Sequence, residues 1–123
     1  MRGAVIVLSA AACLAACSDP EEHVASCDQV AARGKILYAR HGCAVCHGPD
    51  GRGDGPVGRS MKQKPRDFRD VNAFRNGRSL GAISETIRLG VAHRGVGMPA
   101  YPHLPEEERR TLAAYVVSIH EMD

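Results

Sequence analysis

Hydrophobic residues recur at helical spacing near the C-terminal end of the chain. Between Pro105 and His120 the apolar positions are three or four residues apart, the spacing at which side chains share one face of a helix. The glutamates from Glu106 to Glu108 stand at the N-terminal end of this segment, where the helix dipole favours negative charge. The pattern predicts a helix over 105–120, with an apolar face made of Leu112, Tyr115, Val116 and Ile119.

Two segments further upstream have the same periodicity. Residues 28–40 are predicted to form one helix, with Asp28 near its N-cap and Gly42 just beyond its end. Residues 79–89 are predicted to form another, with Ser79 as the N-cap. The shared faces are Val30, Gly34, Leu37 and Tyr38 in the first helix, and Leu80, Ile83 and Ile87 in the second.

The segments between these helices lack a regular period. Glycine is dense from 48 to 58, which favours a tight loop whose backbone passes close to a ligand. No helix opening with Lys-Ser or Lys-Thr follows it, so it does not match a phosphate-binding loop. Residues 59–77 and 95–101 are predicted to be irregular loops. Beyond a possible short turn pair nothing in the sequence suggests strands, so the patterns predict helices joined by loops.

The N-terminal region has the features of an export signal. Arg2 precedes an uncharged apolar run over 4–16, which is short for a membrane span and suits a signal peptide. The run ends in Leu14-Ala15-Ala16-Cys17, which resembles a bacterial lipobox and makes Cys17 the expected lipidation site; ordinary signal peptidase cleavage is the alternative. We expect a lipid-anchored periplasmic protein with a signal peptide at 1–16, a tether at 17–27 and a domain at 28–123.

Composition and charge limit the partners. The 123 residues, with five cysteines, suffice for one domain. Without residues 1–16, which hold one basic residue and no acidic one, the chain has 15 Lys and Arg against 14 Asp and Glu, so nothing calls for nucleic acid. The segment 59–94 is more basic, with nine basic residues against three acidic ones. A docking role for this segment is one interpretation, and a solvated face is the other.

The strongest chemical signal is the pentapeptide Cys43-Ala44-Val45-Cys46-His47. The C-x-x-C-H spacing is that of covalent haem c attachment, in which each thiol adds to one vinyl group of the porphyrin. His47 follows at once and is placed to bind the iron. A redox dithiol would be expected near a βαβ pattern, which the sequence lacks. A zinc site would need a second pair of ligands, and no such pair follows.

The iron also needs a sixth ligand or an open position. Met98 is the preferred candidate, because it lies 51 residues after His47 in a glycine-flanked loop with few apolar neighbours, and Pro99 would stiffen its approach. His93 and His103 flank the same loop and are the next candidates. The remaining candidates are Met61, Met122 and His41.

Over roughly Val30 to His120 the chain resembles the class I monohaem c-type cytochromes. The resemblance implies a small all-α fold, with three to four helices packed around one covalently bound haem and with the first and last helices crossing near Gly34 and Tyr115. Three blocks carry it: Cys43 to Gly48 with the Gly-Asp-Gly-Pro run at 53–56, Gly97 to Tyr101, and Leu104 to Glu108 leading into Leu112 to Val116.

The resemblance also implies roles for single residues. A proline carbonyl usually orients the proximal histidine in these proteins, and Pro56 is the first match, with Pro65 the second. Tyr101, in the methionine block, is assigned to the surroundings of the haem. Cys27 departs from the family pattern and is either a free thiol or an intermolecular link. The implied bonds to the haem are thioethers at Cys43 and Cys46 and axial bonds from His47 and Met98.

These features predict a protein that transfers electrons in the bacterial cell envelope. It would carry them between respiratory-type redox partners, a donor and an acceptor, as a monomeric domain that is not itself an enzyme but could belong to an oxidoreductase complex. One alternative is a haem sensor or ligand-binding module from which Met98 detaches. The other is a small peroxidase, with His93 or His103 as its distal acid–base group.

Overall fold

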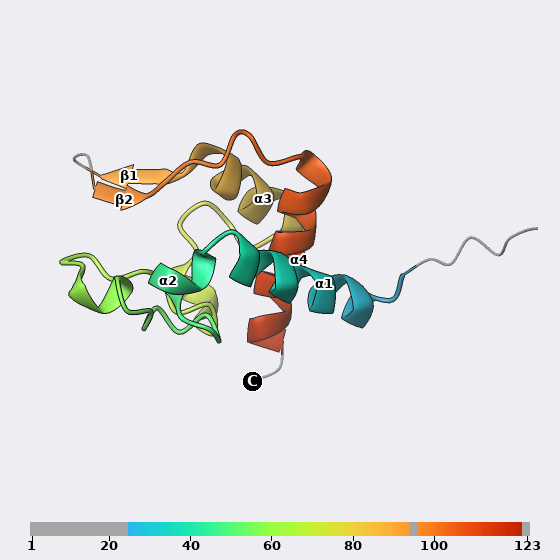
Figure 1. The fold of residues 1–123 in the computed structure, drawn as a ribbon, viewed down its shortest axis with the longest axis horizontal. Coiled ribbons are helices and arrows are strands. Elements are labelled where there is room, and N and C mark those ends of the chain that lie inside the picture. Colours follow the sequence, from blue (N-terminus) through green and yellow to red (C-terminus); the bar gives the residue numbers. More distant parts are fainter. Residues whose placement is uncertain (1–24, 94–95, 122–123) are drawn as a thin grey trace, which may run out of the picture.

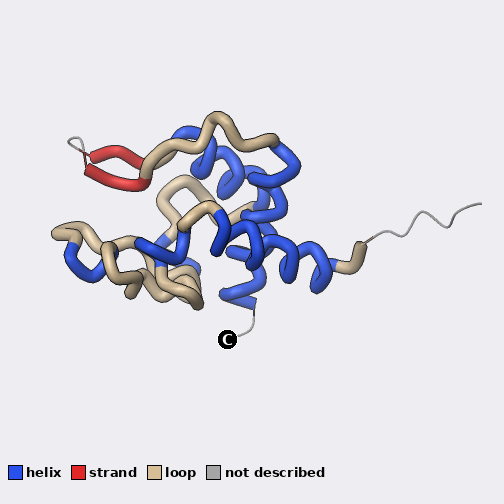
Figure 2. Tube along the Cα trace, in the orientation of Figure 1, coloured by secondary structure: helices blue, strands red, loops and turns tan. Residues whose placement is uncertain are grey.

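The computed structural model describes residues 25–93 and 96–121, which form a small helical domain with one hairpin (Figure 1). The all-α prediction is confirmed. Figure 2 shows that long loops join the helices and that the strands of the described part of the chain lie at one edge. In chain order the elements are α1 (Cys27–Arg40), α2 (Cys43–His47), the 3₁₀ turns η1 (Gly58–Ser60) and η2 (Val71–Ala73), α3 (Leu80–Leu89), β1 (Val91–His93), β2 (Val96–Met98) and α4 (Glu106–Glu121).

The first and last helices cross at Gly34, as predicted. A Cβ atom at this position would overlap the carbonyl oxygen of Thr111 and lie 2.7 Å from the Cβ of Tyr115. Glycine therefore lets the backbones of α1 and α4 approach each other. Beside the crossing, the rings of Tyr38 and Tyr115 meet edge to face with their centroids 5.1 Å apart.

Helix α1 begins one residue before the predicted start, and its N-cap lies two residues before Asp28. Ser26, rather than Asp28, is the N-cap: its hydroxyl accepts from the amide of Gln29, whose side chain accepts from the amide of Ser26. This reciprocal capping box satisfies two amides that helix geometry leaves unpaired. Asp28 lies inside the first turn, where its negative charge is favourable.

The third helix begins after Ser79, whose hydroxyl caps the amide of Ala82 as predicted. Ile83 and Ile87 are buried, whereas Leu80 is 39% exposed and does not belong to the buried face. After α3 the hairpin pairs Val91 with Met98 and His93 with Val96 in antiparallel register. The prediction of a loop from 95 is thus wrong for the residues of β2. This strand forms by pairing with β1, and the spacing of hydrophobic residues in the sequence does not show such pairing.

The core lies between α1, α3 and α4 and takes in two residues from loops. Phe68 and Leu104 come from these loops and are buried in the same cluster as the helix residues. Within the described residues no helix is long and apolar enough to cross a membrane. The core consists of Leu37, Tyr38, Phe68, Ile83, Ile87, Leu104, Leu112, Ala113, Tyr115, Val116 and Ile119.

Candidate haem-binding site

The short helix α2 carries the cysteine–histidine motif, and the loop that follows it holds it in place by hydrogen bonds. Gly42 has a φ of 73°, a left-handed conformation that lets the chain turn from α1 into α2. The loop that follows then returns along α2 and donates to its last carbonyls. The three bonds are Gly53 N–H to His47 O at 2.8 Å, Gly55 N–H to Cys46 O at 3.2 Å and Val57 N–H to Val45 O at 3.0 Å.

These contacts explain two of the glycines between 48 and 58. A Cβ atom at Gly55 or Gly58 would overlap carbonyl oxygens of α2. The close backbone approach predicted for this loop is present, but it is made to α2 and not to a ligand, because none of these glycines lines the cavity described next. The loop therefore supports the motif by hydrogen bonding to the C-terminal carbonyls of α2.

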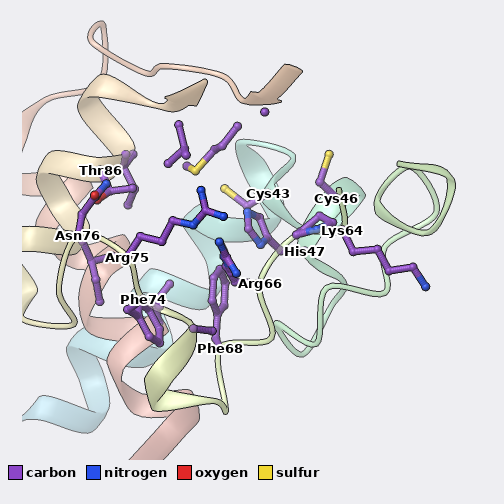
Figure 3. A pocket seen from close by; sticks show the side chains of 18 of the residues that line it. Cys43, Cys46, His47, Lys64, Arg66, Phe68, Phe74, Arg75, Asn76 and Thr86 are labelled. Atoms are coloured by element: carbon purple, nitrogen blue, oxygen red, sulfur yellow. The ribbon is translucent and has the colours of Figure 1, made fainter. Parts of the chain in front are cut away.

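A cavity of about 410 Å³ opens in front of α2. Cys43, Cys46 and His47 line it from α2, and Met98 lines it from β2. Figure 3 shows the two cysteines and the histidine side by side on their helix, with Arg75 reaching toward them and with Phe68 and Phe74 below the cavity. The rest of the wall is largely apolar and includes Phe68, Phe74, Ile83, Ile87, Leu112 and Val116.

The imidazole of His47 is enclosed and held by an aromatic ring. Burial lowers the pKa of His47 below its ordinary value, and the backbone of Arg66 acts in the opposite direction. The ring stacks on Phe68 with a centroid separation of 4.6 Å and an interplanar angle of 26°. Its buried Nδ1 makes no hydrogen bond within the described part of the chain. The neutral form that results is the one that binds metal.

The cysteines do not resemble a redox pair. Burial raises the pKa of the Cys43 thiol, and the neighbouring Cys46 adds to this rise. Reactive redox cysteines have lowered pKa values instead, because the thiolate is the nucleophile. Among the described residues Cys27, Cys43 and Cys46 are all free, and Cys27 is exposed at the start of α1. This environment argues against the dithiol interpretation.

The candidates for the second axial ligand fall into those that line the cavity and those that do not. Met98 is partly buried against the core and lines the cavity, and Met61 lines it as well. His41 is instead bound to Glu108 of α4 at 3.0 Å, and His103 is exposed and does not line the cavity. The side chain of His93 and all of Met122 lie outside the described residues.

Two of the predicted cofactor contacts do not line the cavity, and their roles stay predictions. Pro56 is exposed in the loop behind α2, where its carbonyl accepts from Ser60, whereas Pro65 lines the cavity. Tyr101 does not line the cavity, but burial raises the pKa of its hydroxyl, and Cys43 and Cys46 of the motif add to this rise. Its amide donates to Ile87 of α3 at 3.0 Å. The preference for Pro56 followed proximity in sequence, and the fold instead brings the more distant proline to the cavity.

Several residues of the cavity wall were not predicted. Phe68 and Phe74 stack with centroids 6.1 Å apart, and Phe74 meets His120 edge to face at 5.8 Å. Arg66 and Arg75 also line the wall. All four come from the irregular loop between η1 and α3, which has no period to show which side chains point inward. The scarcity of aromatic residues, with two Phe in the whole chain, was the one signal available.

The donor set and the wall suit a haem. Two thiols and an imidazole project from one short helix, a thioether sulfur lies on the same cavity, and apolar side chains form the remaining wall. These are the groups that hold a porphyrin covalently and bind its iron. The residues present therefore fit the cofactor that the motif indicates.

Comparisons with known proteins agree with this geometry. A family model described as cytochrome c matches residues 31–120, a range that contains the whole site. Among solved structures, the chain is similar to one in the reducing HAO-like protein complex of Kuenenia stuttgartiensis, with 31% sequence identity and a TM-score of 0.66. The similarity covers 75% of this chain and 44% of the other, so this chain spans less than half the length of its relative.

Proposed function

Because the chain belongs to the cytochrome c family, whose domain carries a covalently bound haem c, we propose that it transfers electrons through one haem attached at Cys43 and Cys46. Haem-based electron transfer is the activity that the family indicates. In this proposal His47 and Met98 are the axial ligands. The observation that carries it is the convergence of two thiols, one imidazole and two methionine thioethers on a single, largely apolar cavity.

When bound, the haem supplies one-electron chemistry at its iron, and the chain supplies the surroundings that make the exchange fast. Burial favours the neutral form of His47. The Phe68 ring and the loop that is hydrogen-bonded to α2 hold the imidazole in place. The apolar wall excludes water and disfavours the extra charge of the oxidised state. A methionine sulfur favours the reduced state, so both features raise the reduction potential.

The partners and the location are also part of the proposal. The similar chain belongs to a protein complex, and we infer that this chain exchanges electrons with protein partners, a donor and an acceptor, without catalysing a reaction of its own. We place it in the periplasm, held to a membrane by lipid on Cys17. The division into a signal peptide at 1–16, a tether at 17–27 and a monomeric haem domain at 28–123 completes this arrangement.

Covalent attachment can be tested with acidified organic solvent, which removes haem unless it is bonded to the protein. We expect the haem of the purified protein to stay with the chain, and the double variant Cys43→Ser/Cys46→Ser to release whatever haem it binds. Recovery of the porphyrin from the wild-type protein would contradict the proposal.

The methionine ligand can be tested with a matched pair, because Met61 and Met98 line the same cavity. In the ferric protein Met98→Ala should abolish the weak long-wavelength sulfur-to-iron band, lower the reduction potential and open the iron to carbon monoxide after reduction. Met61→Ala should change none of these. The reverse pattern would assign Met61 as the ligand, and carbon monoxide binding to the wild type would favour a sensor with a labile methionine.

A further inference from the structure

The segment that carries Met98 is attached to the helices that precede and follow it in the chain. Strand β2 pairs with β1, which begins where α3 ends, and residues 99–105 then lead to α4. Figure 1 shows this stretch, in orange, passing over α3 on its way to α4. A ligand side chain needs supporting residues that hold it in place, so the contacts of this stretch bear on Met98.

Gly90 lets the backbone around Met98 lie directly on the C-terminal end of α3. Its φ of 70° and ψ of −177° belong to a region that is essentially limited to glycine. A Cβ atom at this position would lie 2.7 Å from the carbonyl oxygen of Met98, 2.8 Å from the amide nitrogen of Ala100 and 2.9 Å from the carbonyl carbon of Pro99. All three are backbone atoms, which cannot rotate away as a side chain can. An added side chain would therefore displace the backbone of the methionine itself.

Hydrogen bonds continue this attachment further along the segment. The amide of Tyr101 donates to Ile87 O of α3 at 3.0 Å, and the amide of Leu104 donates to Tyr101 O at 3.3 Å. The guanidinium of Arg109 in α4 donates to Leu104 O. Leu104 is itself buried in the core. The stretch after β2 is thus fixed to α3 near its start and to α4 at its end.

We propose that Gly90 and Arg109 are positioning residues for the axial methionine. Gly90 sets how closely the backbone of Met98 approaches α3, and Arg109 holds the far end of the same segment to α4. Neither residue lines the cavity, so each acts through the segment and not by touching the haem. The inference rests on the proposal that Met98 is the axial ligand.

Positioning of this kind decides how readily another ligand reaches the iron. An external ligand binds only while the methionine is detached, so its apparent affinity is proportional to the detached fraction of the protein. A shift of the backbone at Met98 increases that fraction even while the domain stays folded. Retention of the methionine and overall stability are therefore separate quantities, and one set of variants can compare them.

The test is a spectroscopic titration of the full-length ferric haem protein with imidazole, which competes with the methionine for the iron. Gly90→Ala should raise the apparent affinity for imidazole about tenfold and weaken the sulfur-to-iron band. Arg109→Gln, which removes the donor to Leu104 O, should raise that affinity about threefold. Arg109→Lys keeps a donor and the charge, so its affinity should lie between those of the wild type and Arg109→Gln. If Gly90→Ala does not fold, Arg109→Gln decides alone.

Two matched controls separate positioning from loss of stability. Gly34→Ala disturbs the crossing of α1 and α4, where its Cβ atom meets no residue of the methionine segment. Arg110→Gln removes the same charge as Arg109→Gln from the next residue of α4. Both controls should bind imidazole as the wild type does. If Gly90→Ala and Arg109→Gln bind imidazole no more tightly than these controls, the inference is wrong.

A failure of the methionine assignment would give a different result. If Met98→Ala keeps the sulfur-to-iron band, Met98 is not the ligand, and the proposed ligation is overturned together with this inference. If Met98→Ala loses the band while Gly90→Ala and Arg109→Gln match their controls, this inference alone is overturned.

Discussion

At the scale of single residues, two glycines inside helices meet opposite surroundings. A Cβ atom at Gly34 of α1 would overlap the backbone of α4, while a Cβ atom at Gly81 of α3 would meet nothing within 4 Å. Glycine in a helix costs roughly 0.5–1 kcal/mol relative to alanine because it loses more backbone freedom on folding. At Gly34 the close helix crossing requires glycine in spite of this cost, whereas the surroundings of Gly81 leave room for a side chain.

The pair gives a prediction with opposite signs. Gly34→Ala should lower the free energy of unfolding by about 1–3 kcal/mol, because the overlap with the Thr111 carbonyl outweighs the gain in helix propensity. Gly81→Ala should raise it by about 0.5–1 kcal/mol. Denaturant unfolding of the haem protein measures both. Stabilisation by Gly34→Ala would show that α1 and α4 do not cross at this residue.

At the scale of elements, α2 is positioned by its neighbours more than by its own length. Five residues form little more than one turn, which is marginal as an isolated helix. The loop behind it pairs its last carbonyls, and two tyrosines reach the turn that follows. Tyr38 of α1 donates to Gly48 O at 2.7 Å, and Tyr115 of α4 donates to Pro49 O at 3.2 Å. The two crossing helices therefore anchor the end of the haem motif.

These two hydroxyls should differ in importance. Burial raises the pKa of Tyr38 far above its ordinary value, so this hydroxyl stays a donor wherever the protein is folded. Tyr38→Phe should cost about 1–1.5 kcal/mol of unfolding free energy, since the bond is short and buried. Tyr115→Phe, which removes a longer and partly exposed bond, should cost less. Thermal and denaturant unfolding of the two ferric variants tests the order, and equal losses would contradict it.

At the scale of the whole molecule, the domain is joined to its expected membrane anchor by a short segment. Residues 18–26 could span at most about 30 Å when extended, at 3.3–3.6 Å per residue. A lipid on Cys17 would therefore keep the haem within tens of Å of the bilayer and raise its local concentration near membrane partners. Cys17 lies outside the described residues, so the anchor stays a prediction.

Cell fractionation tests the anchor. Cys17→Ser should abolish membrane retention through lipid, leaving uncleaved precursor or a soluble periplasmic form that still carries haem. At about 0.8 kcal/mol per buried CH₂ group, two or more acyl chains hold a protein far more firmly than one. Cys27→Ser is the control, because Cys27 is exposed at the start of α1 and should not affect partition. A wild-type protein found wholly in the soluble periplasm would rule the anchor out.

The sequence by itself determined the features that are encoded locally. The helices over 28–40, 79–89 and 105–120 follow from apolar period and caps, and the structure has them within two residues at each end. The cysteine–histidine motif is equally local, because its spacing alone matches two thioether bonds and one ligand. The crossing of the first and last helices at Gly34 and Tyr115 was predicted from the family resemblance, because members of a family share their helix packing.

Only the tertiary structure decided what the irregular segments contribute. Phe68 stacks on His47, Arg66 and Arg75 face the cavity, and Pro65 rather than Pro56 lines it. The segment 59–77 has no repeating pattern, so the direction of each side chain depends on contacts with distant residues. Phe68 illustrates this, because its amide donates a hydrogen bond to Gly51 O and its ring belongs to the same core cluster as Ile119 of α4. Long-range packing of this kind becomes defined when the helices have come together, and no local pattern records it.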